Sequence, residues 1–198
     1  MFNFNFYTPT RVVFGKETEY RIGKLVKNVN CKKVLLHYGS GSVIRSGLLG
    51  RIKESLDASG VTYVELGGVV PNPRLSLVRK GIGLCRKEGV DFLLAVGGGS
   101  VIDSAKAIGY GLANDGDVRD FYEHTRQASA CLPIGVVLTI AASGSEMSNS
   151  SVITNDETLE KRGYNNDISR PVFAVMNPEI TMTLPPLSLI HISEPTRL

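Results

Sequence analysis

Three consecutive glycines lie between a continuous apolar run and a segment of helical pattern, and they are the strongest chemical signal in the chain. The apolar run is Phe92 to Val96, and Gly97-Gly98-Gly99-Ser100 follows it directly. A glycine backbone has no Cβ atoms, so a ligand can approach it closely. The first turn of a helix also offers free N–H groups at the positive end of its dipole. The segment therefore predicts a binding site for the diphosphate of a dinucleotide. A purely structural alternative is that Ser100 and Asp103, which have the spacing of a helix-capping pair, only stabilise the start of a helix.

A second group of small residues follows an earlier apolar run. Val34 to Tyr38 is succeeded by Gly39-Ser40-Gly41-Ser42. At such a strand end, dinucleotide-binding proteins often carry an acid that binds the ribose 2′-hydroxyl of NAD. Here hydroxyls follow instead, and then Arg45, which favours tolerance of a 2′-phosphate and therefore NADP. Taken alone, a plain turn before a helix is the simpler interpretation.

The third group is a run of small residues after the apolar segment that begins at Val137. Thr139 and Ile140 end that segment, and Ser143-Gly144-Ser145-Glu146 follows soon after. Small side chains let a flat ring or a phosphate approach the backbone. As a motif it is weak, because serine-rich loops are common.

Alternating strands and helices must position these three groups. The predicted strands are 34–38, 61–66, 92–96, 134–138 and 172–176, and the predicted helices are 17–29, 48–59, 74–88 and 101–112. This alternation is typical of βαβ crossovers, so we expect an α/β fold with a mostly parallel, Rossmann-like sheet and flanking helices. Residues 3–7 and 11–14 are expected to form an N-terminal β-hairpin.

The composition excludes several other classes of protein. Of the 198 residues, 42% are hydrophobic, which suffices for a folded core. The 22 Lys and Arg and the 19 Asp and Glu are interspersed without a basic block, which argues against a nucleic-acid partner. No apolar run approaches the ~18 residues that span a bilayer, so no membrane partner is expected. Cys31, Cys85 and Cys131 are too scattered for a disulfide framework, and the chain opens without a secretion signal, so we expect a cytoplasmic protein.

In order and spacing, these segments resemble the iron-dependent (group III) alcohol dehydrogenases, and most closely the branch of butanol dehydrogenases and NADPH-dependent aldehyde reductases. The similarity covers residues 1–186, and the segments that carry it are Tyr38-Gly39-Ser40-Gly41-Ser42, Pro71-Asn72-Pro73, Gly97 to Lys106, Ser143-Gly144-Ser145-Glu146 and Thr183-Leu184-Pro185-Pro186. The resemblance implies a nucleotide-binding domain for NADP or NAD. The implied cofactor-binding residues are Gly39, Ser40, Ser42, Asn72, Gly98, Gly99, Ser100, Asp103, Thr139, Ile140 and Lys161.

The resemblance also implies what the chain does not carry. In this family a second, all-helical domain supplies one Asp and three His ligands for iron or sometimes zinc, and no matching ligands follow Pro186. His37, His124 and His191 share no ligand spacing. We therefore expect neither a metal site nor catalytic residues in this polypeptide. One further departure is Ser150, which stands where many relatives carry Asn.

Residues 187–198 continue none of the preceding periodicity, and their first eleven match the translation of a common sequencing adaptor. We therefore interpret 1–186 as the nucleotide-binding domain and 187–198 as a non-native tail.

The resemblance implies an NAD(P)-dependent oxidoreductase that interconverts a primary alcohol and its aldehyde, with metal-assisted hydride transfer in the intact protein. The chain alone is expected to be inactive. Alternatives are a relative of dehydroquinate synthase or of the polyol dehydrogenases, or a non-catalytic dinucleotide-binding fragment. Relatives often associate through the N-terminal hairpin edge, which allows a homodimer without establishing one.

Overall fold

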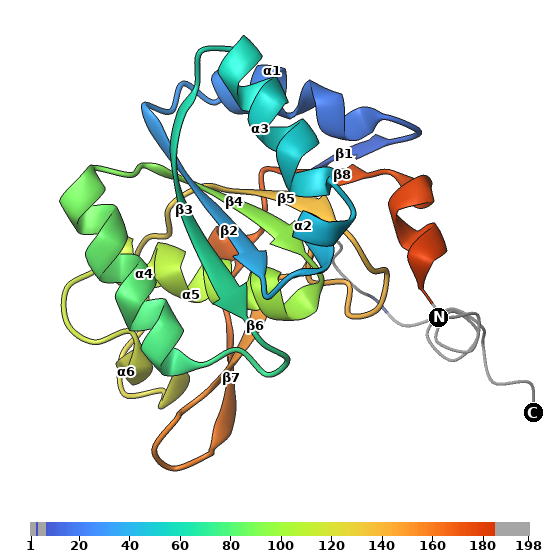
Figure 1. The fold of residues 1–198 in the computed structure, drawn as a ribbon. Coiled ribbons are helices and arrows are strands. Elements are labelled where there is room, and N and C mark those ends of the chain that lie inside the picture. The colour runs from blue at the N-terminus through green and yellow to red at the C-terminus, as the bar shows by residue number, and fades with distance from the viewer. Residues whose placement is uncertain (1–2, 4–6, 185–198) are drawn as a thin grey trace, which may run out of the picture.

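A six-stranded sheet, with all neighbouring strands parallel, forms the centre of the structure (Figure 1), a computed structural model that describes residues 3 and 7–184. The strand order is β1-β8-β5-β4-β2-β3. The strands are β1 (Arg11–Phe14), β2 (Lys33–Gly39), β3 (Thr62–Val69), β4 (Phe92–Gly97), β5 (Ile134–Leu138) and β8 (Phe173–Met176). The expected α/β fold with a parallel sheet is therefore confirmed.

The central strands are buried on both faces, which is why their sequences are continuously apolar. All six residues of β4 and all five of β5 are buried. Along β4, Leu93 belongs to one hydrophobic cluster and Leu94 to the other, because successive side chains of a strand point to opposite faces. The sheet thus separates two cores.

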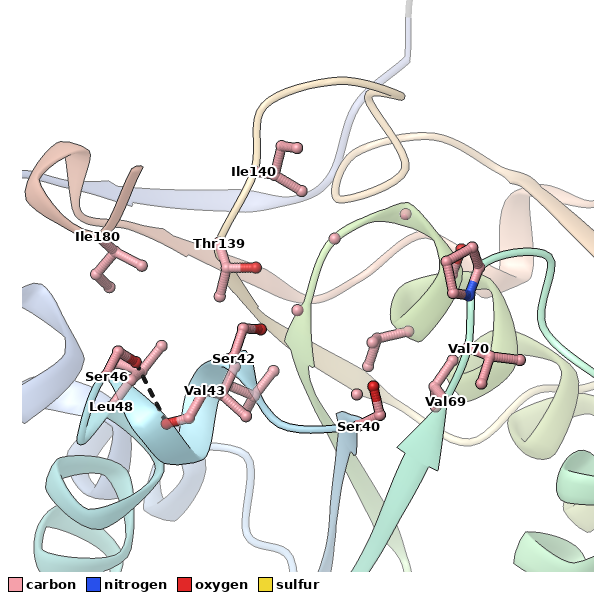
Figure 2. Close-up of a pocket in the computed structure, with 18 of the residues that line it drawn as sticks. Ser40, Ser42, Val43, Ser46, Leu48, Val69, Val70, Thr139, Ile140 and Ile180 are labelled. Carbon is pink, nitrogen blue, oxygen red and sulfur yellow. Dashed lines mark hydrogen bonds between the residues drawn. The ribbon is translucent and has the colours of Figure 1, made fainter. Parts of the chain in front are cut away.

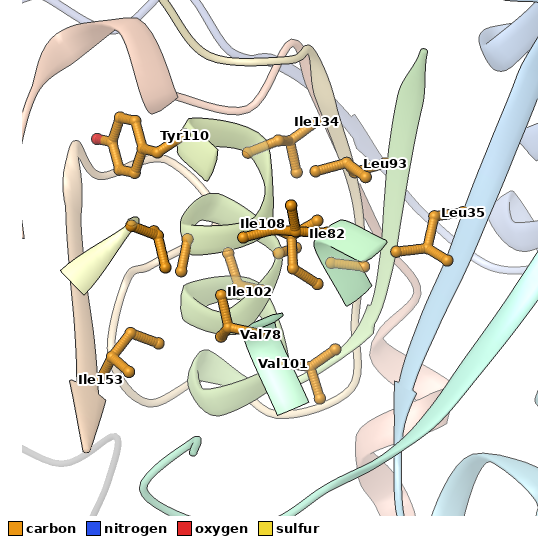
Figure 3. Close-up of a cluster of buried hydrophobic side chains, with 14 of the residues drawn as sticks. Leu35, Val78, Ile82, Leu93, Val101, Ile102, Ile108, Tyr110, Ile134 and Ile153 are labelled. Atoms are coloured by element: carbon orange, nitrogen blue, oxygen red, sulfur yellow. The ribbon is translucent and has the colours of Figure 1, made fainter. Parts of the chain in front are cut away.

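Helices cover both faces of the sheet. On one face lie α1 (Ile22–Lys27) and α3 (Leu48–Ala58), and on the other lie α4 (Leu75–Glu88) and α5 (Gly99–Ala113). Figure 3 shows the core on the α4 and α5 face of the sheet, which contains Leu93. Val78 and Ile82 of α4 lie in it together with Ile102 and Ile108 of α5. The apolar residues Leu75, Val78, Ile82 and Cys85 recur along one side of α4, and all four are buried. Shorter helices are α2 (Ser42–Arg45), α6 (Arg119–Tyr122), η1 (Thr18–Arg21), η2 (Asp167–Ser169) and η3 (Pro178–Thr183).

The N-terminal region differs from the expectation in two ways. β1 pairs in parallel with β8, and the other arm of the expected hairpin falls largely outside the described residues. The single helix expected over 17–29 is instead the 3-10 turn η1 followed by α1. Tertiary contacts explain the interruption, because the buried carboxylate of Glu19 accepts hydrogen bonds from Arg51 and Asn177.

An antiparallel hairpin between β5 and β8 was not predicted. It consists of β6 (Ser150–Thr154) and β7 (Lys161–Asn165), and it packs β6 against α5. The hydroxyl groups of Tyr122 and Ser151 form a buried hydrogen bond of 2.6 Å there. Four of the five residues of β7 are exposed, so this strand lacks the apolar run that marks the strands of the main sheet.

Replacing Gly83 with alanine is expected to stabilise the protein by about 0.5–1 kcal/mol, because glycine in a helix interior loses more backbone entropy on folding than alanine. Gly83 lies in the middle of α4 on its exposed face, and a Cβ there would meet no atom within 4 Å. Urea unfolding followed by circular dichroism measures the change. The matched control is Gly81→Ala, whose Cβ would lie 2.5 Å from Cδ1 of Ile108 and should therefore destabilise. A stability gain in both variants would contradict this reasoning.

Candidate functional site

A cavity of about 470 Å³ opens at the carboxyl ends of β2, β3, β4 and β5. Its position follows from the topology. β2 and β4 are neighbours in the sheet, and β3 lies beyond β2 while β5 lies beyond β4. The segment that follows β2 continues on the α3 face of the sheet, and the segment that follows β4 continues on the α5 face, so the two segments diverge. Open α/β sheets bind ligands at such a switch point, and the volume lies within the roughly 300–1,000 Å³ typical of ligand pockets.

Eight of the eleven sequence-predicted residues line this one cavity: Gly39, Ser40, Ser42, Gly98, Gly99, Ser100, Thr139 and Ile140. They come from three strand ends that are far apart in the sequence, and Figure 2 shows the wall of the cavity that Ser40, Ser42, Thr139 and Ile140 help to form. The sequence analysis missed the apolar part of the wall. It includes Val43, Leu48, Val69, Val70, Ile180 and Leu184. Only Leu184 had a signal, as part of the Thr183 to Pro186 segment.

The start of α5 presents unpaired backbone donors at the cavity. The first bonds of the helix run from the amides of Val101 and Ile102 to the carbonyl of Gly98. Within the described part of the chain, the amides of Gly98, Gly99 and Ser100 donate to no protein acceptor. The Ser100–Asp103 pair does not cap this helix, because Gly98 occupies the N-cap position and no side chain bonds there. The donors therefore remain free for an anion.

Close approach explains the glycines. A Cβ at Gly98 would overlap Cγ2 of Ile140, and a Cβ at Gly99 would overlap the hydroxyl of Ser143. The backbone of Gly98 has φ −92°, which any residue can adopt. A side chain at this position is therefore excluded by its overlap with Ile140 and not by the backbone conformation.

The lining suits an anion. It combines the hydroxyls of Ser40, Ser42, Ser46 and Thr139 with apolar side chains, and none of the described residues that line it is acidic. At the β2 end, the guanidinium of Arg45 lies over Gly41, since a Cβ on Gly41 would be 2.7 Å from Nη1. A positive charge therefore lies beside the cavity, and the part of its wall that the structure describes carries no negative side chain.

The other three predicted residues lie outside this cavity. Asn72 has φ +58° in the turn beside Pro71, which does line the cavity. Lys161 begins β7 and is exposed. Asp103 lies one turn into α5, and its carboxylate accepts hydrogen bonds from the hydroxyl of Ser145 at 2.6 Å and the amide of Val152 at 3.1 Å. Burial raises the pKa of Asp103, against the opposing effects of Ser145, Lys106 and Val152.

The buried side chain of His37 links three elements, β2, β3 and α5. Nδ1 of His37, in β2, lies 2.8 Å from the carbonyl oxygen of Leu66 in β3, and Nε2 lies 2.9 Å from the hydroxyl of Ser104 in α5. The side chain is fully buried, and burial lowers its pKa to about 4, although the Leu66 hydrogen bond acts in the opposite direction. A neutral ring therefore donates to Leu66 and accepts from Ser104. This geometry places His37 in a structural role.

Residues 3 and 7–184 contain no group of three or more His, Cys, Asp or Glu side chains that could hold a metal ion. His37 is buried and His124 is exposed. Within the same residues, no helix has the length and apolar character needed to cross a membrane.

Comparison with known proteins gives consistent matches. The sequence model of the family described as "Iron-containing alcohol dehydrogenase" matches residues 9–178. The chain is 49% identical over 185 residues to the probable NADH-dependent butanol dehydrogenase 2 of Bacillus subtilis, covering 93% of this chain and 47% of that protein. It is 36% identical over 189 residues to the NADPH-dependent aldehyde reductase YqhD of Escherichia coli, covering 94% of this chain and 48% of that protein.

The fold matches as well as the sequence. The crystal structure of NADH-dependent butanol dehydrogenase A from Thermotoga maritima superposes with a TM-score of 0.93 at 41% identity, over 96% of this chain and 48% of that one. The chain thus spans about half the length of the curated relatives it matches.

Proposed function

Because the chain belongs to the iron-containing alcohol dehydrogenase family, we propose that its cavity binds NADH or NADPH in an oxidoreductase that interconverts a primary alcohol and its aldehyde. The observation that carries the proposal is the set of free amides of Gly98, Gly99 and Ser100 at the start of α5. Family membership also favours a dehydrogenase over a cyclising lyase of the dehydroquinate synthase type.

The cavity fits a dinucleotide in three respects. Free amides at a helix N-terminus bind the diphosphate, which the positive end of the helix dipole also favours. Gly98 and Gly99 leave the space that a phosphate needs. The apolar wall of Val43, Leu48 and Ile180 offers a surface on which an adenine ring can pack.

The described residues hold and orient the cofactor in this proposal. When bound, the nicotinamide supplies the hydride exchanged with the substrate carbon. The backbone amides at the start of α5 fix the diphosphate relative to β4 and α5, and the described side chains that line the cavity include no acid that would repel it. No ligand set for the family's metal exists among the described residues, so we assign no step to a metal ion.

The β2 end bears on the choice between NADH and NADPH. Among the described residues, no carboxylate lines the cavity near Ser40 and Ser42 to repel a 2′-phosphate, and Arg45 lies close by. The relatives are divided, since the butanol dehydrogenases carry NADH in their names and YqhD carries NADPH. We therefore propose that the chain accepts both cofactors.

Titration of the purified chain with NADH and with NADPH, followed by ligand fluorescence, tests the proposal. We expect saturable binding of both, with dissociation constants that differ by less than about tenfold, or roughly 1.4 kcal/mol. ADP should compete and adenosine should not, because the amides of α5 bind the diphosphate. Absence of saturable binding up to millimolar concentrations of either cofactor would refute the proposal.

An aldehyde-dependent assay separates binding from turnover. With butanal added, we expect cofactor binding by this chain without steady oxidation of NADH, since the described residues hold no metal-ligand set. Turnover on addition of Fe²⁺ or Zn²⁺ would show that residues outside the described ranges contribute ligands.

A further inference from the structure

Lys106 is a fully buried lysine in the middle of α5, seven residues after the helix begins. Its Nζ lies 2.8 Å from the carbonyl oxygens of Ser145 and Ser150 and 2.9 Å from that of Ser148. The hydroxyls of Ser145 and Ser148 lie further away, at 3.1 and 3.4 Å. All of these hydrogen-bond partners are neutral oxygen atoms, so this lysine differs from the usual buried lysine that pairs with a carboxylate.

The segment bound by Lys106 has almost no regular structure of its own. Residues 139–149 form neither helix nor strand. Three carbonyl groups of the segment 145–150 converge on one ammonium group, which has three N–H donors to offer. Asp103 and Arg170 add two further anchors, through the hydroxyl of Ser145 and the carbonyl of Met147.

The same segment forms one wall of the cavity. Thr139 and Ile140 line it, and Ser143 lies so close to Gly99 that no side chain fits between them. α5 therefore supplies both the free amides at its first turn and the ammonium that holds the opposite wall.

We propose that Lys106 is a positioning residue that holds segment 139–150 in the conformation required for cofactor binding. The inference rests on the proposed function, and it adds a specific chemical requirement. Three carbonyl oxygens require three N–H donors. A neutral amine has only two and presents a lone pair to the third carbonyl. The segment should therefore be held less well when Lys106 loses its proton.

The surroundings set the pH at which this happens. Burial lowers the pKa of Lys106 to about 8, against the opposing charges of Asp103 and Glu146, while Arg170 acts in the same direction as burial. Cys131 also faces this group, but burial raises its pKa to about 12, so the thiol stays neutral near pH 8. Burial also raises the pKa of Asp103, while the Ser145 hydroxyl, the charge of Lys106 and the Val152 amide act in the opposite direction.

The test compares the full chain with Lys106→Met, which keeps length and removes the donors. NADH affinity of the wild-type chain should weaken by about tenfold between pH 7 and 9.5, a size typical of coupling between a site and a distant group. Affinity of Lys106→Met should already be weak at pH 7 and should stay constant with pH. The matched control is Arg86→Met, which removes a cation bonded to the carbonyl of Gly111 at the other end of α5 and should keep the wild-type profile.

A second measurement does not need the cofactor or a change in overall stability. Hydrogen exchange of amides 139–150 should be faster in Lys106→Met than in the wild-type chain, with exchange in α4 unchanged. If the wild-type affinity is constant from pH 7 to 9.5, or if variant and wild type share affinity and exchange rates, this inference is overturned while the proposed function stands. If the wild-type chain binds no cofactor at all, the proposed function falls and takes this role with it.

Discussion

Gly98→Val is expected to weaken NADH binding by at least about 100-fold, which corresponds to roughly 2.7 kcal/mol. The new side chain would overlap Ile140 and occupy space next to the first turn of α5, because Gly98 is the N-cap residue of that helix. The bound diphosphate would lose charge-assisted hydrogen bonds, each worth about 1.5–3 kcal/mol. Fluorescence titration measures the dissociation constant.

The backbone at Gly98 makes this variant a clean test. Its φ of −92° is accessible to valine, so the substitution adds no backbone strain. The overlap with Ile140 should cost some stability, and thermal unfolding of the unliganded variant measures that cost separately from binding. Gly83→Ala, on the exposed face of α4, is the control and should bind NADH like the wild-type chain. Unchanged affinity in Gly98→Val would refute the assignment of the α5 amides as the diphosphate seat.

Acidification should destabilise the protein through His37. The pKa of this buried imidazole is lowered to about 4 in the folded chain, against 6.5 for the ordinary side chain. Between these values the unfolded chain binds more protons than the folded chain, so the free energy of unfolding rises with pH. Stability is therefore lost as the pH falls from about 6.5 to about 4, by up to about 3 kcal/mol, since a tenfold change in proton affinity is worth about 1.4 kcal/mol.

His37→Gln isolates this effect, because glutamine can hydrogen-bond but does not titrate. Urea unfolding at several pH values from 4 to 7 should show a smaller loss of stability on acidification in the variant than in the wild-type chain. His124→Gln changes an exposed residue and should keep the wild-type slope. Protonation of carboxyl groups with a lowered pKa, such as Asp117, also makes the protein less stable in acid. The decisive quantity is therefore the difference in slope between His37→Gln and the wild-type chain. Identical slopes would contradict the proposed role of burial.

The sheet could be predicted because burial on both faces leaves a clear trace in a sequence. Phe92–Gly97 and Ile134–Leu138 are apolar, and a run of small residues follows each of them within a few positions, so both their position and the end that faces the cavity follow from pattern alone. The same reasoning placed Gly98, Gly99 and Thr139 at strand ends, which the topology brings to one cavity.

Other features depend on partners that no local pattern reveals. β7 is polar and exposed, so its period resembles that of a loop. His37 and Ser104 are 67 residues apart, and their hydrogen bond exists only because β2 and α5 pack together. The partners of Lys106 are backbone carbonyls in a serine-rich segment, and a sequence does not show where a carbonyl points.

The pairing of β1 with β8 has a consequence for how the chain acquires its shape. Residues 11–14 find their neighbours only at 173–176, and the link between Glu19 and Asn177 spans 158 positions. Contacts this distant must overcome the entropy of closing a long loop, which slows their formation. During synthesis, β2 to β5 can pair with one another before β8, the partner of β1, has been translated. β1 is thus among the last strands to be fixed, and β2 to β5, whose ends form most of the cavity wall, are among the first.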